Sequence, residues 1–204
     1  MNTTPTQLRA PATSPTLRPS RPLALSARLW SMLGRRQALT RVLRHAWQSL
    51  VEVSPGGGQD LLYLAQSRPS AIYGAISERG KDLRKTKARC PWAVTQKGHA
   101  TAHPYAQVLE LRPDRVLFTY SLGTLADPLG ALRNARRGLA LGGEVIVIDF
   151  WHLEQCPEWL RPLLKPLLRA SGVRPLSKSL MAHFDATVEP GPLGLWAVAR
   201  IKRA

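Results

Sequence analysis

Acidic residues are scarce in this sequence, and none precedes Glu52. The 204 residues contain 13 Asp and Glu against 29 Lys and Arg, which gives a formal net charge of +16. An excess of this size attracts polyanions such as nucleic acid, an anionic membrane surface or an acidic partner. An arginine-rich genomic composition that only keeps the protein soluble would give the same numbers, so charge alone does not identify a partner.

Cysteine and long apolar runs are also scarce. Cys90 and Cys156 are the only cysteines, and their separation matches no zinc or redox spacing. No apolar run reaches the roughly 18 residues that span a bilayer, and "RPLALSARLW" is too short and too interrupted by arginine for a signal-peptide core. We therefore expect a cytoplasmic protein, whose basic surface also allows peripheral contact with an anionic membrane.

The start of the chain is rich in Ser, Thr, Pro and Arg. This composition predicts a disordered basic arm over residues 1–25, followed by one domain over residues 26–204. An arginine-rich start without acidic residues also fits an organelle transit peptide, and the composition does not separate the two.

Helical and strand-like patterns alternate along the rest of the chain. Apolar spacings of three and four predict a helix between about Ser26 and Trp47. Short apolar runs predict strands over residues 49–53, 71–77, 93–98, 114–122, 144–150 and 191–203. Helical patterns separate most of these runs, which predicts an α/β fold: a doubly wound, mostly parallel sheet with helices on both faces. Pro157, Pro162 and Pro166 predict a broken or kinked helix within residues 156–173.

Three consecutive glycines at positions 56–58 follow the first predicted strand. Ligands of open parallel sheets bind beyond the carboxyl ends of the strands, where glycines let the backbone approach a ligand closely. The next helix would point its positive N-terminus into the same space. Taken alone, the loop fits a dinucleotide, an adenosyl group, a phosphate or only a tight turn.

The residues around these glycines narrow the choice. Glu52 precedes Gly58 by six residues, giving E-x-S-x-G-x-G, which resembles the E/D-x-G-x-G-x-G loop of class I S-adenosylmethionine-dependent methyltransferases. "YGAISE", "KGHATA" and "DRVLFTYSLGTLADPLGALRNARRGLALGGEVIVIDF" resemble later segments of that family in the same order. "VIDFWHLEQCPEWLR" and the closing "GLWAVARI" look most like the betaine-lipid group, which trimethylates the amine of diacylglyceryl-homoserine.

The resemblance implies S-adenosylmethionine as the cofactor and a set of residues that contact it. That set is Glu52, Ser54, Gly56, Gly58, Gln59, Ile76, Glu78, His99, Ala100, Tyr120 and Ser121. Tyr120 would be catalytic, because its ring can stabilise a cationic methyl or ammonium group, although simple packing explains a tyrosine there equally well.

Three residues after the fifth predicted strand would line the substrate side of the site. Asp149 would hold an ammonium group, Trp151 would form part of a cation cage and His152 would lie beside them. The plainer alternatives are that Asp149 caps the next turn and that His152 is an ordinary surface residue.

Three departures from the family pattern point to a degenerate cofactor site. The family has a carboxylate that binds the ribose where this sequence has Ile76 or a one-residue deletion beside Ala75, and Glu78 lies two residues after Ile76. His99 replaces an aspartate, and Ser54 replaces the first loop glycine, which a negative φ at Ser54 would allow.

Two functions therefore compete. The first is a methyltransferase acting on a small-molecule or lipid amine. The second is a noncatalytic, methyltransferase-like pseudoenzyme that serves as a binding or partner subunit of another protein. Nucleic acid is not indicated as a partner, because no aromatic residues are interleaved with the basic stretches.

Overall fold

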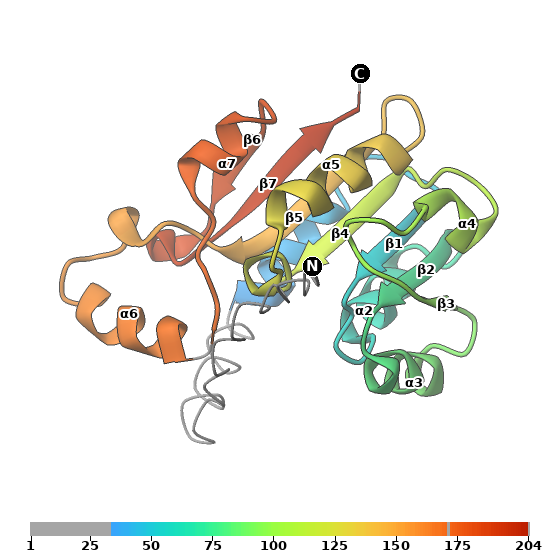
Figure 1. The fold of residues 1–204 in the computed structure, drawn as a ribbon, viewed down its shortest axis with the longest axis horizontal. Helices are drawn as coiled ribbons and strands as arrows, with labels where there is room; N and C mark the ends of the chain where they lie inside the picture. Colours follow the sequence, from blue (N-terminus) through green and yellow to red (C-terminus); the bar gives the residue numbers. More distant parts are fainter. Residues whose placement is uncertain (1–33, 171, 204) are drawn as a thin grey trace, which may run out of the picture.

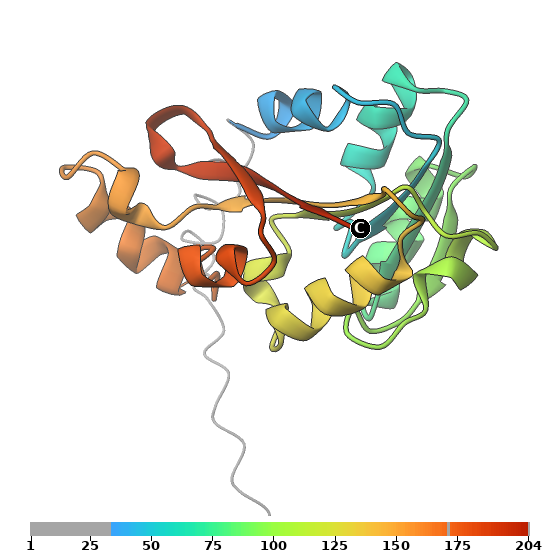
Figure 2. The same cartoon turned by 90° about the horizontal axis from the view of Figure 1, so that it is seen from above.

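The computed structural model describes residues 34–170 and 172–203, which form a seven-stranded sheet with helices on both faces (Figures 1 and 2). The strand order is β3-β2-β1-β4-β5-β7-β6. Strands β1 to β5 are parallel, and β7 runs antiparallel between β5 and β6. The predicted α/β fold with a mostly parallel sheet is confirmed. The predicted arm over residues 1–25 lies outside the described residues.

The elements follow one another with short connections. Residues 34–42 are helical and are called the first helix below. The others are β1 (Ser49–Val53), α2 (Gln59–Ser67), β2 (Ile72–Ser77), α3 (Gly80–Arg89), β3 (Val94–Lys97), α4 (Tyr105–Leu109), β4 (Arg115–Thr119), η1 (Leu122–Thr124), α5 (Pro128–Gly138), β5 (Glu144–Phe150), η2 (Leu153–Gln155), α6 (Arg161–Ala170), α7 (Lys178–Ala182), β6 (Thr187–Pro190), η3 (Pro192–Gly194) and β7 (Trp196–Lys202).

The six predicted strands are present, but three short elements were missed. These are α4, α7 and β6, each only four or five residues long, which is too short to show a clear periodicity. The prediction over residues 156–173 was a broken or kinked helix, and the break is absent. Helix α6 is continuous from Arg161, because Pro157 precedes it and Pro162 occupies its first turn, where no backbone hydrogen bond is lost. Only Pro166 lies inside it.

Alternating side chains of the strands form two apolar cores. Leu50 and Leu117 pack toward the first helix and α2, while Val51, Val53 and Phe118 pack in the core that α4, α5 and α7 share. Figure 2 shows these two groups of helices on opposite sides of the sheet. No helix within the described residues is long and apolar enough to cross a membrane.

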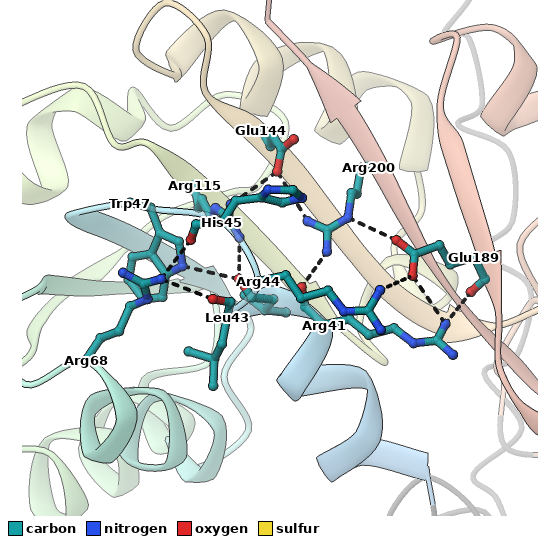
Figure 3. Close-up of polar contacts among 11 residues, drawn as sticks. Arg41, Leu43, Arg44, His45, Trp47, Arg68, Arg115, Glu144, Glu189 and Arg200 are labelled. Carbon is teal, nitrogen blue, oxygen red and sulfur yellow. Dashed lines mark hydrogen bonds and ion pairs between the residues drawn. The ribbon is translucent and has the colours of Figure 1, made fainter.

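Buried arginines share one carboxylate at the amino ends of the central strands (Figure 3). Arg115 Nη2 lies 3.3 Å and Arg200 Nη1 lies 3.2 Å from Oε2 of Glu144, and all three side chains are at least nine-tenths buried. Burial lowers the pKa of Arg115 to about 10, against the opposing effect of Glu144, so the guanidinium stays charged at neutral pH.

The same two arginines hold the end of the first helix against the sheet. Arg115 donates to the carbonyl of Val42, and Arg200 donates to the carbonyl of Arg41. Arg68, at the end of α2, donates to the carbonyls that follow, those of Leu43 (3.1 Å) and His45 (2.9 Å). The last carbonyls of a helix have no partners within it, and positive charge is favourable there. The network thus sets where the first helix lies.

We expect Glu144→Gln to lower the free energy of unfolding by about 3–5 kcal/mol, because it leaves two buried guanidinium groups without a counter-charge. The melting temperature should fall by on the order of 10 °C. Glu189→Gln is the matched control, since the Glu189 side chain also pairs with arginines but is about a third exposed, and it should cost less than about 1 kcal/mol. Equal losses in the two variants would contradict a special role for Glu144.

Candidate functional site

The β1–α2 loop contains three residues in the left-handed region. Their φ angles are 56° at Ser54, 63° at Gly56 and 71° at Gly58. The negative φ that would allow serine in place of the first loop glycine is therefore absent, and Ser54 occupies a conformation that favours glycine. A Cβ added at Gly56 would meet nothing within 4 Å, so this glycine faces open space, and the neighbouring Gln59 is exposed at the start of α2. The loop can admit a ligand at Gly56.

Helix α3 contacts the loop at Gly57 and Gly58. Arg89 donates to the carbonyl of Gly57. A Cβ at Gly58 would lie 3.0 Å from Cγ2 of Thr86, so only glycine allows this close approach. The loop is thus anchored on its inner side and open on its outer side.

A buried acidic pair lies beneath the loop. Glu52 is 1% exposed, and its Oε2 has no hydrogen-bond partner. Asp60, in the first turn of α2, accepts two hydrogen bonds from Arg35 of the first helix, at 2.6 and 2.8 Å. Burial raises the pKa of Glu52 well above its ordinary value, and the neighbouring Asp60 carboxyl adds to the rise, while Arg35 opposes it. Sequence reasoning missed Arg35 and Asp60, because 25 residues separate them.

The ends of β2 and β3 place Glu78 and His99 together. Ile76 pairs with Val53 inside the sheet and is fully buried, whereas Glu78 is the first residue after β2. Oε1 of Glu78 lies 2.8 Å from Nδ1 of His99, and the two side chains are 49% and 70% exposed. The carboxylate available at this edge is therefore that of Glu78. Ala100 is buried, and its carbonyl accepts hydrogen bonds within the fold.

The end of β4 presents two polar side chains without partners. Thr119 Oγ1 and the Tyr120 hydroxyl are buried and form no hydrogen bond. Tyr120 has a φ of 48°, and its ring packs 5.2 Å from that of Phe150. Burial raises the pKa of Tyr120, so its hydroxyl keeps its proton at neutral pH. Ser121 is engaged, because its Oγ donates to the carbonyl of Val53 at 3.1 Å.

At the end of β5, the side chain of Asp149 has hydrogen-bond partners. Asp149 is fully buried and accepts hydrogen bonds from the backbone N–H groups of Gly123 (3.0 Å) and Phe150 (2.8 Å). Burial raises its pKa to about 7, against these hydrogen bonds. Oδ2 thus holds the turn after β4, while Oδ1 bonds the backbone of Phe150 within β5, so both oxygens are engaged by the backbone.

Trp151 and His152 carry unsatisfied groups. Trp151 Nε1 and both ring nitrogens of His152 are buried without hydrogen-bond partners. Nδ1 of His152 lies 3.5 Å from Glu154 Oε2 without forming a hydrogen bond. Burial lowers the pKa of His152, which keeps the ring neutral. The centroids of the two rings lie 4.4 Å apart, so the unpartnered nitrogens of Trp151 and His152 belong to neighbouring rings.

The unpartnered buried side-chain atoms of the described residues thus gather at one edge of the sheet. They belong to residues at or just beyond the carboxyl ends of β1, β4 and β5, namely Glu52, Thr119, Tyr120, Trp151 and His152. Each such atom costs roughly 1–3 kcal/mol when buried, and such groups in native proteins call for an explanation. Their position makes this edge the candidate site. Within the same residues, no three His, Cys, Asp or Glu side chains are close enough to hold a metal ion.

Comparison with known proteins identifies the fold. The sequence matches no protein-family profile, and no curated protein matches it significantly. Among solved structures, it is similar to a putative O-methyltransferase of Nostoc punctiforme PCC 73102, with a TM-score of 0.69 and 19% identity over 93% of this chain and 63% of that one. The pyocyanin biosynthetic protein PhzM gives a TM-score of 0.67 and 21% identity over 90% of this chain and 59% of that one.

A third similar structure is closer in length. It is the complex of the Haloferax volcanii Trm112 methyltransferase activator and the putative methyltransferase, with a TM-score of 0.63 and 14% identity over 90% of this chain and 97% of that one. The chain spans less than two thirds of the length of the first two proteins. At these identities the likeness establishes the fold, which is the Rossmann-like fold of class I methyltransferases.

We expect Glu52→Gln to stabilise the protein at alkaline pH. Because the pKa of Glu52 is higher in the folded chain, the folded state holds its proton more strongly, and stability falls as the pH rises above 4.5 toward that raised value. Glutamine removes this loss, so the melting temperature should rise by at least about 2 °C at pH 8, or roughly 1 kcal/mol. At pH 4 the variant and the parent should melt alike. A variant that melts below the parent at both pH values would contradict a raised pKa of Glu52 in the folded protein.

Proposed function

We propose that this chain binds S-adenosylmethionine at the carboxyl edge of its sheet and transfers the methyl group to an acceptor. The observation that carries this proposal is the gathering of unpartnered buried polar atoms beside an open glycine loop. That edge is where open sheets of parallel strands bind ligands. The solved structures of this fold that are named as putative methyltransferases support it.

The residues at this edge fit the parts of such a cofactor. The free Oε2 of Glu52 offers an acceptor for an ammonium group, and Gly56 leaves room for the backbone to approach the ligand. Glu78 takes the role that the sequence pattern assigns to a carboxylate at the position of Ile76, and its exposed oxygens can accept from ribose hydroxyls. His99 lies beside it for the adenine. In this proposal the carboxylate of Glu78 acts in place of the one that is missing at Ile76, two residues earlier.

Methyl transfer from a sulfonium to an amine requires little acid–base catalysis. When bound, the cofactor supplies a methyl group activated on a sulfonium. Tyr120 and Thr119 line the end of β4, where the acceptor must be aligned and water excluded. If the acceptor is an amine, it releases a proton after methylation. The neutral His152 has a free ring nitrogen that can take this proton.

The acceptor that we propose is an amine carried by a small molecule or lipid. Support comes from α6 and the residues before it, where Trp159 is 68% and Leu163 is 64% exposed, with Arg161 and Lys165 close by in the sequence. Exposed apolar side chains among basic ones suit an apolar acceptor at an anionic lipid surface. The names of the similar structures make a hydroxyl acceptor the competing outcome.

The noncatalytic alternative is supported by an outermost strand of the sheet, which can pair with another strand. Strand β3 is the outermost strand on its side, and Trp92 and Val94 are exposed along it. An extended segment of a protein partner could add to this strand. The activator named with the Haloferax volcanii methyltransferase shows that a protein of this fold can bind a partner.

Calorimetry with S-adenosylmethionine separates the two functions. We expect micromolar binding to the parent chain, and binding about 10–100-fold weaker for Glu78→Ala, because a charge-assisted contact contributes about 2–3 kcal/mol. Glu158→Ala removes an exposed carboxylate outside the site and should bind as the parent does. No detectable binding at millimolar cofactor would favour the partner-subunit alternative.

The lipid acceptor has its own test. We expect Trp159→Ala/Leu163→Ala to reduce cosedimentation with phosphatidylglycerol vesicles, and methyl transfer to a vesicle-borne amine, by about tenfold, because apolar burial into the interface is lost. The affinity for S-adenosylmethionine should stay unchanged. Methylation of soluble hydroxyl compounds with no vesicle binding in the parent would rule out a lipid amine.

A further inference from the structure

A second hollow, distant from the candidate site, is lined by arginines. It has a volume of about 450 Å³, and its polar lining consists of Arg112, Arg133, Arg136, Arg137, Arg203 and His183. Helix α5 supplies the central three arginines, while Arg112 precedes β4 and Arg203 follows β7. Figures 1 and 2 show α5 and α7 on the same face of the sheet, and Arg203, just after β7, contacts the carbonyl of Arg137 in α5. We call this hollow the arginine pocket.

The pocket lies at the opposite edge of the sheet from the proposed cofactor site. Lys202, just before Arg203, pairs with Glu144, which is the first residue of β5. Arg112 likewise lies three residues before the start of β4. The pocket is therefore at the amino ends of strands whose carboxyl ends carry the unpartnered atoms. A ligand here would not occupy the cofactor site.

None of the five pocket arginines has a carboxylate partner among the described residues. The arginines that form ion pairs there are Arg35, Arg41, Arg44, Arg115 and Arg200, all outside the pocket. No Asp or Glu lines the hollow. Like charges so close together repel one another, and the structure supplies no anion of its own to offset this.

Several of these guanidinium groups are held in place rather than free in solvent. Arg112 Nη1 and Arg203 Nη1 both donate to the carbonyl of Arg137, each at 3.1 Å, and both also donate to that of Leu139. Arg133 Nη2 lies 3.2 Å from Nε2 of His183, and since a guanidinium only donates, the imidazole accepts. The remaining N–H groups of these side chains are thus pre-positioned to receive an anion.

We infer that the arginine pocket binds a ligand carrying two or more linked phosphates. A guanidinium group can donate two parallel hydrogen bonds to a phosphate group. The positive charge of five arginines is larger than the negative charge of a single carboxylate, so a ligand with several negative charges fits the pocket better. The volume falls in the range of small-molecule sites. Phe184 of the lining is buried, so its ring is not available for stacking on a base. The phosphates, rather than a base, are what the pocket recognises.

Calorimetry with inorganic tripolyphosphate tests this inference. We expect the parent to bind with a Kd in the micromolar range at low salt, weakening as salt is added. Arg136→Ala/Arg137→Ala should bind at least tenfold more weakly, as should Arg133→Glu. The side chains of Arg136 and Arg137 form no hydrogen bond within the described structure, so the double variant should keep the parent's melting temperature.

The matched control is Arg36→Ala/Arg84→Ala, which removes the same charge from exposed positions outside the pocket. We expect it to bind tripolyphosphate as the parent does. Equal losses in the two double variants would overturn the inference, because attraction would then be due to net charge alone. Cofactor binding should be unchanged in all of these variants, so this test stands apart from that of the proposed function.

Two further probes decide the source of the phosphates. Binding of adenosine triphosphate equal to that of tripolyphosphate supports recognition of the phosphates alone, wherever they are attached. Binding of single-stranded RNA or of phosphatidic acid vesicles, without binding of tripolyphosphate, would overturn the small-ligand inference in favour of an extended polyanion.

Discussion

The pairing of Glu144 with Arg115 and Arg200 is the interaction on which the arrangement of this protein most depends. The three charges are buried, so each is tolerable only because the others are present. The two guanidinium groups also bind the last carbonyls of the first helix, which would otherwise lack partners. One carboxylate therefore sets the position of a helix as well as the junction of β4, β5 and β7.

The position of that helix has a consequence at the other edge of the sheet. The first helix carries Arg35, which neutralises Asp60 beneath the glycine loop. Asp60 is thereby occupied, and Glu52 beside it remains buried with a free oxygen and a raised pKa. At the amino edge the buried charges satisfy one another, whereas at the carboxyl edge polar atoms are left over. This contrast supports the carboxyl edge as the place for the proposed cofactor.

Two groups of arginines stand out among the described residues. Some arginines act as internal counter-charges and helix caps, as Arg35, Arg68, Arg115 and Arg200 do. Others gather in the arginine pocket without any acidic partner. The net charge of +16 is therefore not spread evenly over the described residues, and the arginines of the pocket are without a carboxylate partner there.

Local patterns in the sequence determined the alternation of strands and helices, the loop of glycines after β1 and the placing of Glu52, Tyr120 and His152 at strand ends, because these depend on neighbouring residues alone. The tertiary structure decided what those side chains contact. Pairing of β1 with β2 buried Ile76 and left Glu78 at the edge, and packing turned Asp149 inward onto the backbone of Gly123. Arg35 reached Asp60, and the pocket arginines came together, across separations along the chain that no local pattern records. Such contacts depend on how elements pack in space, so a single sequence specifies them without displaying them.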